Sequence, residues 1–295
     1  MSNSSKARAW PDSNLYPFES RYQPLSAGRM HYIEQGSGEV LLFVHGTPTW
    51  SFLYRDFVKH LSGNYRCIAI DHLGFGLSEK PDCLDGSPQW HADNLLEFIR
   101  QKDLKNITLV VHDFGGPIGL GAALQESGRI KRVVLFNTWL WATAQDPAAQ
   151  KIDKMVNSWL GRFLYFNLNF SPKVLLKKGF ADKRNLSKTV HQYYVQPFSD
   201  KNSRQSLYKI AQSLVGASDW YQQQWEQLHQ LEDKEWLILW GTQDEFIKPD
   251  YLTRWKERLP QAEIHPFNCG HFVQEEDSSG ALDAIRNFMA KFKGA

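Results

Sequence analysis

A carboxylate stands where the sequence joins an apolar run to a glycine-rich turn. The stretch V-V-H-D-F-G-G-P-I-G, residues 110–119, follows the β-branched run 107–111 and precedes a small-residue helical pattern over 118–124. A strand therefore leads into a tight turn and then into a helix, with Asp113 at the tip. An unperturbed aspartate has a pKa of about 3.9 and is ionised near neutral pH. It can attack carbon without help from a base and form an alkyl ester.

A histidine and a second aspartate complete a set that could hydrolyse such an ester. Asp244 lies in G-T-Q-D and His271 in N-C-G-H, each after an apolar run. His271, oriented by Asp244, would deprotonate a water molecule that attacks the ester carbonyl. General-base help of this kind accelerates a reaction by roughly 10²–10⁴-fold. We therefore expect a His271 variant to be alkylated but not to turn over.

The oxyanion formed during ester hydrolysis needs hydrogen-bond donors. The backbone N–H groups of Phe114, just after the turn, and of Thr47, in H-G-T-P, are the candidates. Each such donor stabilises the transition state by roughly 3 kcal/mol.

Each residue of the set also has a structural explanation when taken alone. Asp113 could cap the N-terminus of the following helix, because aspartate is a favoured cap. Asp244 could be an ordinary turn residue, and His271 could be a surface histidine with satisfied hydrogen bonds. Their order along the chain, together with H-G-T-P, favours the catalytic interpretation.

Apolar runs alternate with helical patterns, which predicts a doubly wound α/β sheet. Most of the runs are continuous, as is typical of strands buried on both faces of a parallel sheet, but the first alternates and suggests an antiparallel start. Ligands bind at the carboxyl ends of parallel strands, so the candidate residues should meet at one edge. The predicted strands cover residues 30–33, 40–44, 67–70, 107–111, 133–136, 236–240 and 262–266.

About 100 residues without a comparable strand separate the run that ends at 136 from the one that starts at 236. This region is rich in aromatic and basic residues. We interpret residues 141–215 as a helical cap on a core formed by 1–140 and 216–295. The alternative for residues 151–170 is an amphipathic helix on a membrane surface. A lid packed on a core would show the same pattern of residues, so the pattern fits both.

Composition excludes several classes of protein. Among the 295 residues, 42% are hydrophobic and 22% are charged, and the formal net charge is +2. These values are typical of a soluble globular enzyme and give no support for a nucleic-acid partner. No apolar stretch is long enough to span a membrane. We expect a monomer or small homo-oligomer without stable membrane association.

Three cysteines, an odd number, indicate free thiols in a reducing compartment. They are Cys67, Cys83 and Cys269. The start of the chain, residues 1–11, has no apolar segment and is not expected to be a signal peptide, so we expect a cytoplasmic location. Cys269 lies two residues before His271, which leaves open a functional thiol, although a small packing residue is the ordinary role.

The motifs together resemble the haloalkane dehalogenase branch of the α/β-hydrolases. They are H-G-T-P-T-W-S-F-L-Y-R (45–55), D-H-L-G-F-G-L-S-E-K-P (71–81), H-D-F-G-G-P-I-G (112–119), Y-V-Q-P-F (194–198), G-T-Q-D (241–244) and G-H-F-V-Q-E-E (270–276). Asp113 takes the place of serine in the nucleophile turn, with Val111 in place of its first glycine. The resemblance implies cleavage of carbon–halogen bonds by water without cofactor or metal, in an apolar pocket under a helical cap.

The resemblance also defines the acid and the leaving-group pocket. In one sub-pattern of the family a glutamate stands where this chain has Asn137, so the acid here is assigned to Asp244. Family members usually bind the departing halide with a tryptophan after the nucleophile and an asparagine after H-G or a cap tryptophan. The chain has Phe114 and Thr47 at the first two places. The pocket is expected to be lined by Thr47, Phe114, Asn137, Trp139 and Trp141.

Three other functions compete with dehalogenation of a small apolar substrate. Epoxide hydrolases use the same aspartate with two cap phenols. The candidates for these phenols are Tyr165, Tyr193, Tyr194 and Tyr208. The β-lactone decarboxylases of olefin synthesis resemble this branch too and share the asparagine at 137. A catalytically inactive ligand-binding protein of the same fold is the third alternative. It would account for Phe114 and Thr47, but not for the complete set of catalytic residues.

Overall fold

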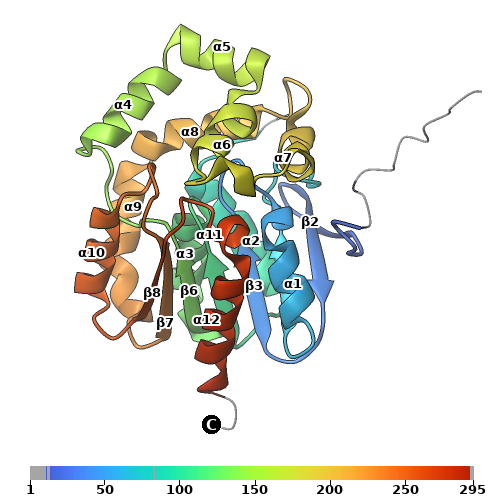
Figure 1. Ribbon diagram of the computed structural model, residues 1–295, viewed down its shortest axis with the longest axis vertical. Helices are drawn as coiled ribbons and strands as arrows, with labels where there is room; N and C mark the ends of the chain where they lie inside the picture. Colours follow the sequence, from blue (N-terminus) through green and yellow to red (C-terminus); the bar gives the residue numbers. More distant parts are fainter. Residues whose placement is uncertain (1–10, 12–13, 83, 293–295) are drawn as a thin grey trace, which may run out of the picture.

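A mixed sheet runs through the centre of the protein (Figure 1). The computed structural model describes residues 11, 14–82 and 84–292, so Cys83 and the expectation for the first ten residues lie outside it. In that part of the chain, eight strands form one sheet in the order β1-β2-β4-β3-β5-β6-β7-β8. The strands are β1 (Arg21–Leu25), β2 (Gly28–Gln35), β3 (Val40–Val44), β4 (Arg66–Ile70), β5 (Ile107–Val111), β6 (Ile130–Phe136), β7 (Glu235–Gly241) and β8 (Glu263–Phe267).

The sheet confirms the predicted fold class. β2 pairs antiparallel with β1 and β4, and the strands from β4 onward pair in parallel. Each of the seven predicted runs forms a strand. β1 was missed because R-Y-Q-P-L is an edge strand whose side chains are largely exposed, and so it shows no apolar run; Pro24 is tolerated there because an edge strand leaves one row of backbone groups unpaired.

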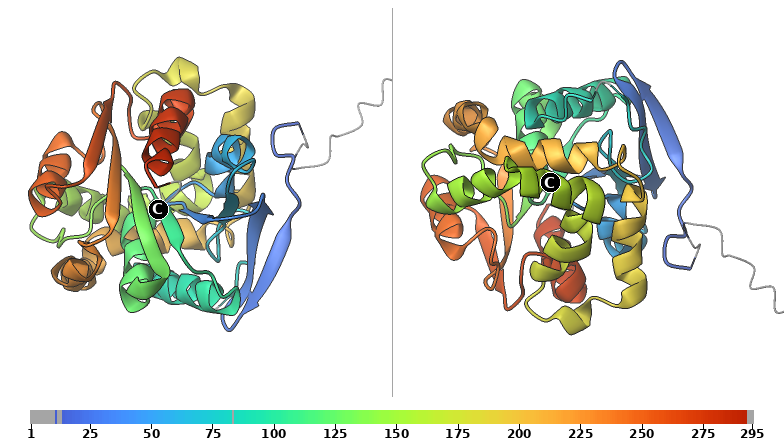
Figure 2. Two further views of the ribbon diagram at one scale, coloured as in Figure 1. Left: turned by 90° about the horizontal axis from the view of Figure 1, so that it is seen from below. Right: turned by 90° about the horizontal axis from the view of Figure 1, so that it is seen from above.

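Helices cover both faces of the sheet (Figure 2). One apolar cluster lies between the sheet and α2, α3 and α9, and the other lies between the sheet and α1, α11 and α12. The helices are α1 (Arg55–Leu61), α2 (Pro88–Gln101), α3 (Gly115–Gln125), α4 (Pro147–Val156), α5 (Trp159–Leu168), α6 (Leu176–Lys178), α7 (Lys188–Val195), α8 (Gln205–Gly216), α9 (Ser218–Gln227), α10 (Pro249–Arg258), α11 (Val273–Glu276) and α12 (Ser278–Ala290). Short 3₁₀ or π turns occupy Ser51–Tyr54, Ser127–Arg129, Ser171–Leu175, Lys183–Asn185, Gln196–Phe198 and Leu228–Leu231.

Helices α4 to α8, which lie between β6 and β7 in the chain, form a layer above the carboxyl ends of the strands (Figure 1). α4 and α5 are separate helices because Ser158 starts a new one: its hydroxyl accepts a hydrogen bond from the N–H of Gly161. Both helices pack against α8. Helices α4 to α8 fall close to the predicted range 141–215, but the division into core and cap stays a prediction.

The turn between β5 and α3 is packed too tightly for ordinary side chains. Asp113 has a φ of 53°, the left-handed region that most residues avoid. A Cβ at Gly115 would lie 2.3 Å from the carbonyl oxygen of Val44, and one at Gly116 would lie 1.8 Å from Oγ1 of Thr138. The same Oγ1 donates a hydrogen bond to the carbonyl oxygen of Asp113 at 2.6 Å. Because Gly115 and Gly116 have no side chains, the turn can pack directly against Val44 and Thr138.

We expect the substitution Gly116→Ala to reduce the free energy of unfolding by about 1–3 kcal/mol, because overpacking displaces Thr138. Urea denaturation followed by circular dichroism measures the change. Gly128→Ala is the matched control: no atom lies within 4 Å of its added Cβ, and its stability should change by less than about 1 kcal/mol. Equal midpoints for the two variants would contradict this account of the turn.

Candidate active site

The carboxylate of Asp113 lies between backbone N–H groups and the imidazole of His271. The backbone N–H of Thr47 donates to Oδ1 at 2.7 Å, and the backbone of Phe114 also hydrogen-bonds the carboxylate. Oδ2 lies 3.4 Å from Nε2 of His271. Gly46 permits this approach, since a Cβ there would lie 2.2 Å from Oδ1 of Asp113. The backbones of both residues predicted to form an oxyanion hole thus hydrogen-bond the Asp113 carboxylate.

His271 is fixed in orientation by its second ring nitrogen and by its backbone. Nδ1 donates to Oδ2 of Asp244 at 2.7 Å. The ring is buried, and the backbone N–H donates to the carbonyl oxygen of Gly179, next to α6, at 2.7 Å. Nε2 of His112 bonds the carbonyl oxygen of His271 at 2.9 Å. Burial lowers the pKa of His112 to about 3, so this supporting ring is neutral and donates from Nε2.

Asp244 is a fully engaged carboxylate rather than an ordinary turn residue. Oδ1 accepts hydrogen bonds from the backbone N–H groups of Phe246 at 2.7 Å and Ile247 at 3.0 Å. Oδ2 accepts from His271 and, at 2.9 Å, from the side-chain amide of Asn137. Both oxygens therefore have two donors each, which fixes the plane of the carboxylate and the imidazole bound to it.

Asn137 corrects one sequence expectation. It was predicted to line the leaving-group pocket, but its side chain bridges Asp244 and the backbone of Gly241. Its amide donates to the carbonyl oxygen of Gly241 at 3.0 Å, and its Oδ1 accepts from the N–H of Gly241 at 2.7 Å. It is fully buried. Both ends of its amide are used, so Asn137 positions the acid. The clue in the sequence was its place directly after a strand, where the family's glutamate would stand.

Trp141, also predicted to line the pocket, lies in an aromatic cluster. Its ring packs against Trp225, Trp255 and Tyr251, with centroid distances of 5.2, 5.6 and 5.0 Å, in a cluster beside α10. Arg254 stacks over the same ring. This packing accounts for the aromatic ring at position 141 and favours a packing role over a role as leaving-group donor.

Two unpaired polar atoms lie in residues that touch the Asp113 turn. The ring of Trp139 packs edge-on against Phe114 at a centroid distance of 4.9 Å. Its Nε1 is buried and has no hydrogen-bond partner among the described residues, and the same holds for Oγ1 of Thr47. An unmade bond at a buried donor costs about 1–3 kcal/mol, so both atoms are suited to a polar group of a ligand.

The charges of the site are strongly coupled. Burial alone would lower the pKa of His271, but the carboxylates of Asp244 and Asp113 raise it to about 10. Burial alone would raise the pKa of Asp113, but its hydrogen bond to His271 and the charge of that ring hold it below the usual value. The imidazole therefore lies between two carboxylates whose charges favour its protonated form.

The remaining candidates have structural partners. Tyr194 donates its hydroxyl to Glu275, and Tyr165 shares a hydrogen bond with Ser171. These two phenols are engaged away from Asp113, so the epoxide alternative loses two of its four candidates. Cys269 is buried, and burial raises its pKa to about 11, which disfavours a reactive thiol. The described residues contain no cluster of His, Cys, Asp and Glu suited to hold a metal ion.

Comparisons with known proteins identify the family of the chain. The family model described as "alpha/beta hydrolase fold" matches residues 39–278. A cis-3-alkyl-4-alkyloxetan-2-one decarboxylase of Shewanella oneidensis is 35% identical, covering 94% of this chain and 90% of the relative. Haloalkane dehalogenase 2 of Mycobacterium tuberculosis is 32% identical, covering 93% and 96%. The crystal structure of the haloalkane dehalogenase DatA from Agrobacterium tumefaciens matches with a TM-score of 0.83 and 23% identity, covering 95% and 99%, and supports the fold.

The sequence resemblance is thereby confirmed at the level of the family. The chain belongs to the α/β-hydrolase fold family, as a dehalogenase-like hydrolase of the branch that contains haloalkane dehalogenases and alkyloxetanone decarboxylases.

Proposed function

We propose that Asp113 attacks a saturated carbon of a haloalkane and that His271 then directs water onto the resulting ester. The observation that carries this proposal is the geometry of the Asp113 carboxylate: Thr47 holds Oδ1, and Oδ2 lies 3.4 Å from His271. In the first step a bond forms between Oδ2 and carbon while the carbon–halogen bond breaks and its electron pair leaves with the halide. No proton is transferred in this step, so no base is needed.

The second step returns Asp113 to its starting state. Nε2 of His271 takes a proton from water as the water oxygen attacks the carboxyl carbon of the ester. Negative charge develops on Oδ1, to which the N–H of Thr47 already donates, and the backbone of Phe114 hydrogen-bonds the same carboxylate. Collapse of this intermediate releases the alcohol and regenerates the carboxylate. Substrate, water, alcohol and halide are the small molecules that the site handles.

A change of charge links the two steps. The carboxylates of Asp244 and Asp113 raise the pKa of His271 to about 10, which favours the protonated ring. Ester formation removes the charge of Asp113, which is one of the groups that raise this pKa. Burial lowers the pKa of His271, and after ester formation fewer charges oppose this effect. The imidazole then becomes able to accept a proton. Alkylation therefore prepares the base for hydrolysis.

Trp139 and Thr47 are the proposed donors to the departing halide. Both have a buried, unpaired polar group beside the Asp113 turn. A halide leaving into an apolar space without donors would carry a large desolvation cost. An indole N–H and a hydroxyl would reduce it, in place of the tryptophan and asparagine usual in the family.

Opening of a β-lactone is the second candidate. Asn137 and the 35% identity to an alkyloxetanone decarboxylase favour it. The same Asp113 attack would break the carbon–oxygen bond of the lactone ring, and the departing carboxylate would spread its charge over two oxygens. That leaving group depends less on N–H donors than a halide does.

We further propose a cytoplasmic location and a monomer or small homo-oligomer, with 141–215 acting as a cap on the core. Cys67 and Cys269 are free thiols, which fits a reducing compartment. No helix in the described residues is long and apolar enough to cross a membrane.

The variant His271→Ala should accumulate a covalent ester when it is incubated with 1,2-dibromoethane or 1-iodobutane. Alkylation needs only the Asp113 carboxylate, whereas hydrolysis needs the base. Intact-mass measurement and peptide mapping should find one alkyl group at Asp113. The double variant with Asp113→Asn is the control and should remain unmodified. A wild-type chain that releases no halide, together with a His271→Ala variant that forms no adduct, would exclude dehalogenation; adducts with lactones alone would select the second candidate.

The variant Asp113→Asn should lower the pKa of His271 below the value of about 10 in the wild type. The amide has the size of the carboxylate but no charge, as in the ester, so one of the groups that favour the imidazolium is lost. Titration of the imidazole signals by NMR measures the shift. Asp283→Asn, on the outer face of α12, is the control and should leave the titration unchanged. An unaltered pKa in Asp113→Asn would contradict the proposed link between the two steps.

The variant Trp139→Phe should lower kcat/KM for a bromoalkane by about 10²-fold, because it removes one leaving-group donor while keeping an aromatic ring. Trp141→Phe is the matched control, since that ring packs in a separate cluster, and its kcat/KM should change little. Halide release and lactone consumption should be measured for both variants. Equal losses in the two variants would show that Trp139 acts only through packing.

A further inference from the structure

Exposed apolar side chains gather on one helix of the upper layer. The described residues contain six large hydrophobic side chains that are exposed, and five of them fall within 159–174. Trp159 is 80% exposed, and Leu160, Phe163 and Leu168 are each close to half exposed. They lie on α5 (Trp159–Leu168), the uppermost helix in Figure 1. Burial of such side chains is strongly favourable in water, so this concentration on one helix marks a contact surface.

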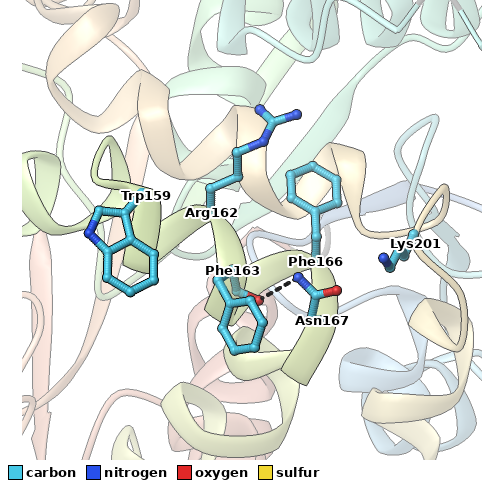
Figure 3. A pocket seen from close by; sticks show the side chains of 6 residues that line it. All are labelled: Trp159, Arg162, Phe163, Phe166, Asn167 and Lys201. Atoms are coloured by element: carbon cyan, nitrogen blue, oxygen red, sulfur yellow. Dashed lines mark hydrogen bonds between the residues drawn. The ribbon is translucent and has the colours of Figure 1, made fainter.

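The helix also borders a hollow with an aromatic wall. The hollow has a volume of about 440 Å³, and Figure 3 shows the rings of Trp159, Phe163 and Phe166 around it, together with Arg162 and Lys201. Asn167 uses its side-chain amide within the helix, donating to the carbonyl oxygen of Phe163 at 3.3 Å. The hollow therefore offers apolar walls with two cations at its rim.

The surrounding layer has a positive net charge, whereas the rest of the protein has a negative one. Residues 147–216 contain 12 Lys and Arg against 3 Asp and Glu, a net charge of +9. The rest of the chain contains 22 basic and 29 acidic residues, a net charge of −7. A second hollow of about 700 Å³ beside Val174 is lined by Lys173, Lys177, Lys178 and Lys183. One acidic residue, Glu245, also lines it and pairs with Lys178 at 3.4 Å.

We propose that α5 and the lysine-rich segment 173–183 that follows it in the chain form a docking surface for an anionic phospholipid bilayer. Trp159, Phe163 and Leu160 would enter the interface between headgroups and acyl chains, with α5 lying parallel to the membrane plane. Lys173, Lys177 and their neighbours would contact the phosphate groups. This arrangement of aromatic residues on one side and lysines around them is typical of interfacial helices.

Charge separates a bilayer from a second copy of this chain. Two copies that met through this layer would bring two faces of +9 together, and like charges would oppose the contact. An anionic membrane offers the opposite charge over the whole layer and an apolar phase for the aromatic rings. The acidic remainder of the molecule would face away from the lipid.

The contact would be reversible, since one helix and a charged rim give far less binding than a spanning segment. The pattern of residues 151–170 is also compatible with an amphipathic helix on a membrane surface, the alternative to a lid. The structure divides this segment into α4 and α5, both packed on α8, and leaves the outer face of α5 open. One helix can therefore be part of the lid and also bind the membrane.

Cosedimentation with lipid vesicles tests the proposal without reference to catalysis. The full chain should bind vesicles of phosphatidylcholine with phosphatidylglycerol on the order of tenfold or more tightly than vesicles of phosphatidylcholine alone, and added salt should weaken the binding. Trp159→Ser with Phe163→Ser should reduce the binding on the order of tenfold. Lys173→Gln with Lys177→Gln should do the same on anionic vesicles only. Thermal unfolding verifies that the variants are folded.

Matched controls lie elsewhere on the surface. Tyr22→Ser removes the sixth exposed hydrophobic side chain, on β1, and Lys59→Gln with Lys105→Gln removes two exposed charges from the other half. Both should bind vesicles like the wild type. Equal binding by all variants, or no preference for anionic lipid, would overturn the proposal. A dimer that Trp159→Ser with Phe163→Ser dissociates would overturn it in favour of a second copy, and equally tight binding to soluble polyglutamate would overturn it in favour of an acidic protein.

Discussion

The structure of the site depends on the contact between one buried imidazole and two carboxylates. His271 donates to Asp244 at 2.7 Å and lies 3.4 Å from Asp113. Burial of an isolated charge in this position would be very costly, and each partner offsets that cost for the others. Asn137 and the backbone N–H groups after Asp244 hold the acid, while Thr47 and Phe114 hold the nucleophile. The loops at the carboxyl ends of β3, β5, β6, β7 and β8 are therefore all required for one arrangement of charge.

The sequence allowed the fold to be predicted because its strands are buried and continuous. Residues 40–44 and 107–111 are buried along their whole length and read as such in the sequence. The β1 strand was not predicted, because most of its side chains are exposed and its sequence therefore has no apolar run. The three candidate residues were found because their order along the chain is unusual in combination. The catalytic roles of Asp113, Asp244 and His271 remain predictions, to be tested by trapping of the ester.

The leaving-group pocket was harder to predict because packing and hydrogen bonds depend on three-dimensional neighbours. Trp139 and Trp141 are two residues apart and of the same type, yet one contacts Phe114 and the other packs beside α10. Asn137 has the chemistry of a ligand-binding residue, but both ends of its amide are taken by Asp244 and Gly241. Such assignments depend on which atoms remain without a partner, and sequence does not record that.

The backbone bond between His271 and Gly179 joins the helical layer to the base itself. A Cβ at Gly270 would lie 2.2 Å from the carbonyl oxygen of Gly179, and a Cβ at Gly179 would lie 2.5 Å from the ring of Phe272. The two segments therefore pack so closely that a side chain at either glycine would clash. If the whole layer swung outward as one body, it would pull the imidazole away from Asp113. Any motion of the layer that keeps the contact between His271 and Asp113 must therefore leave the α6 end in place.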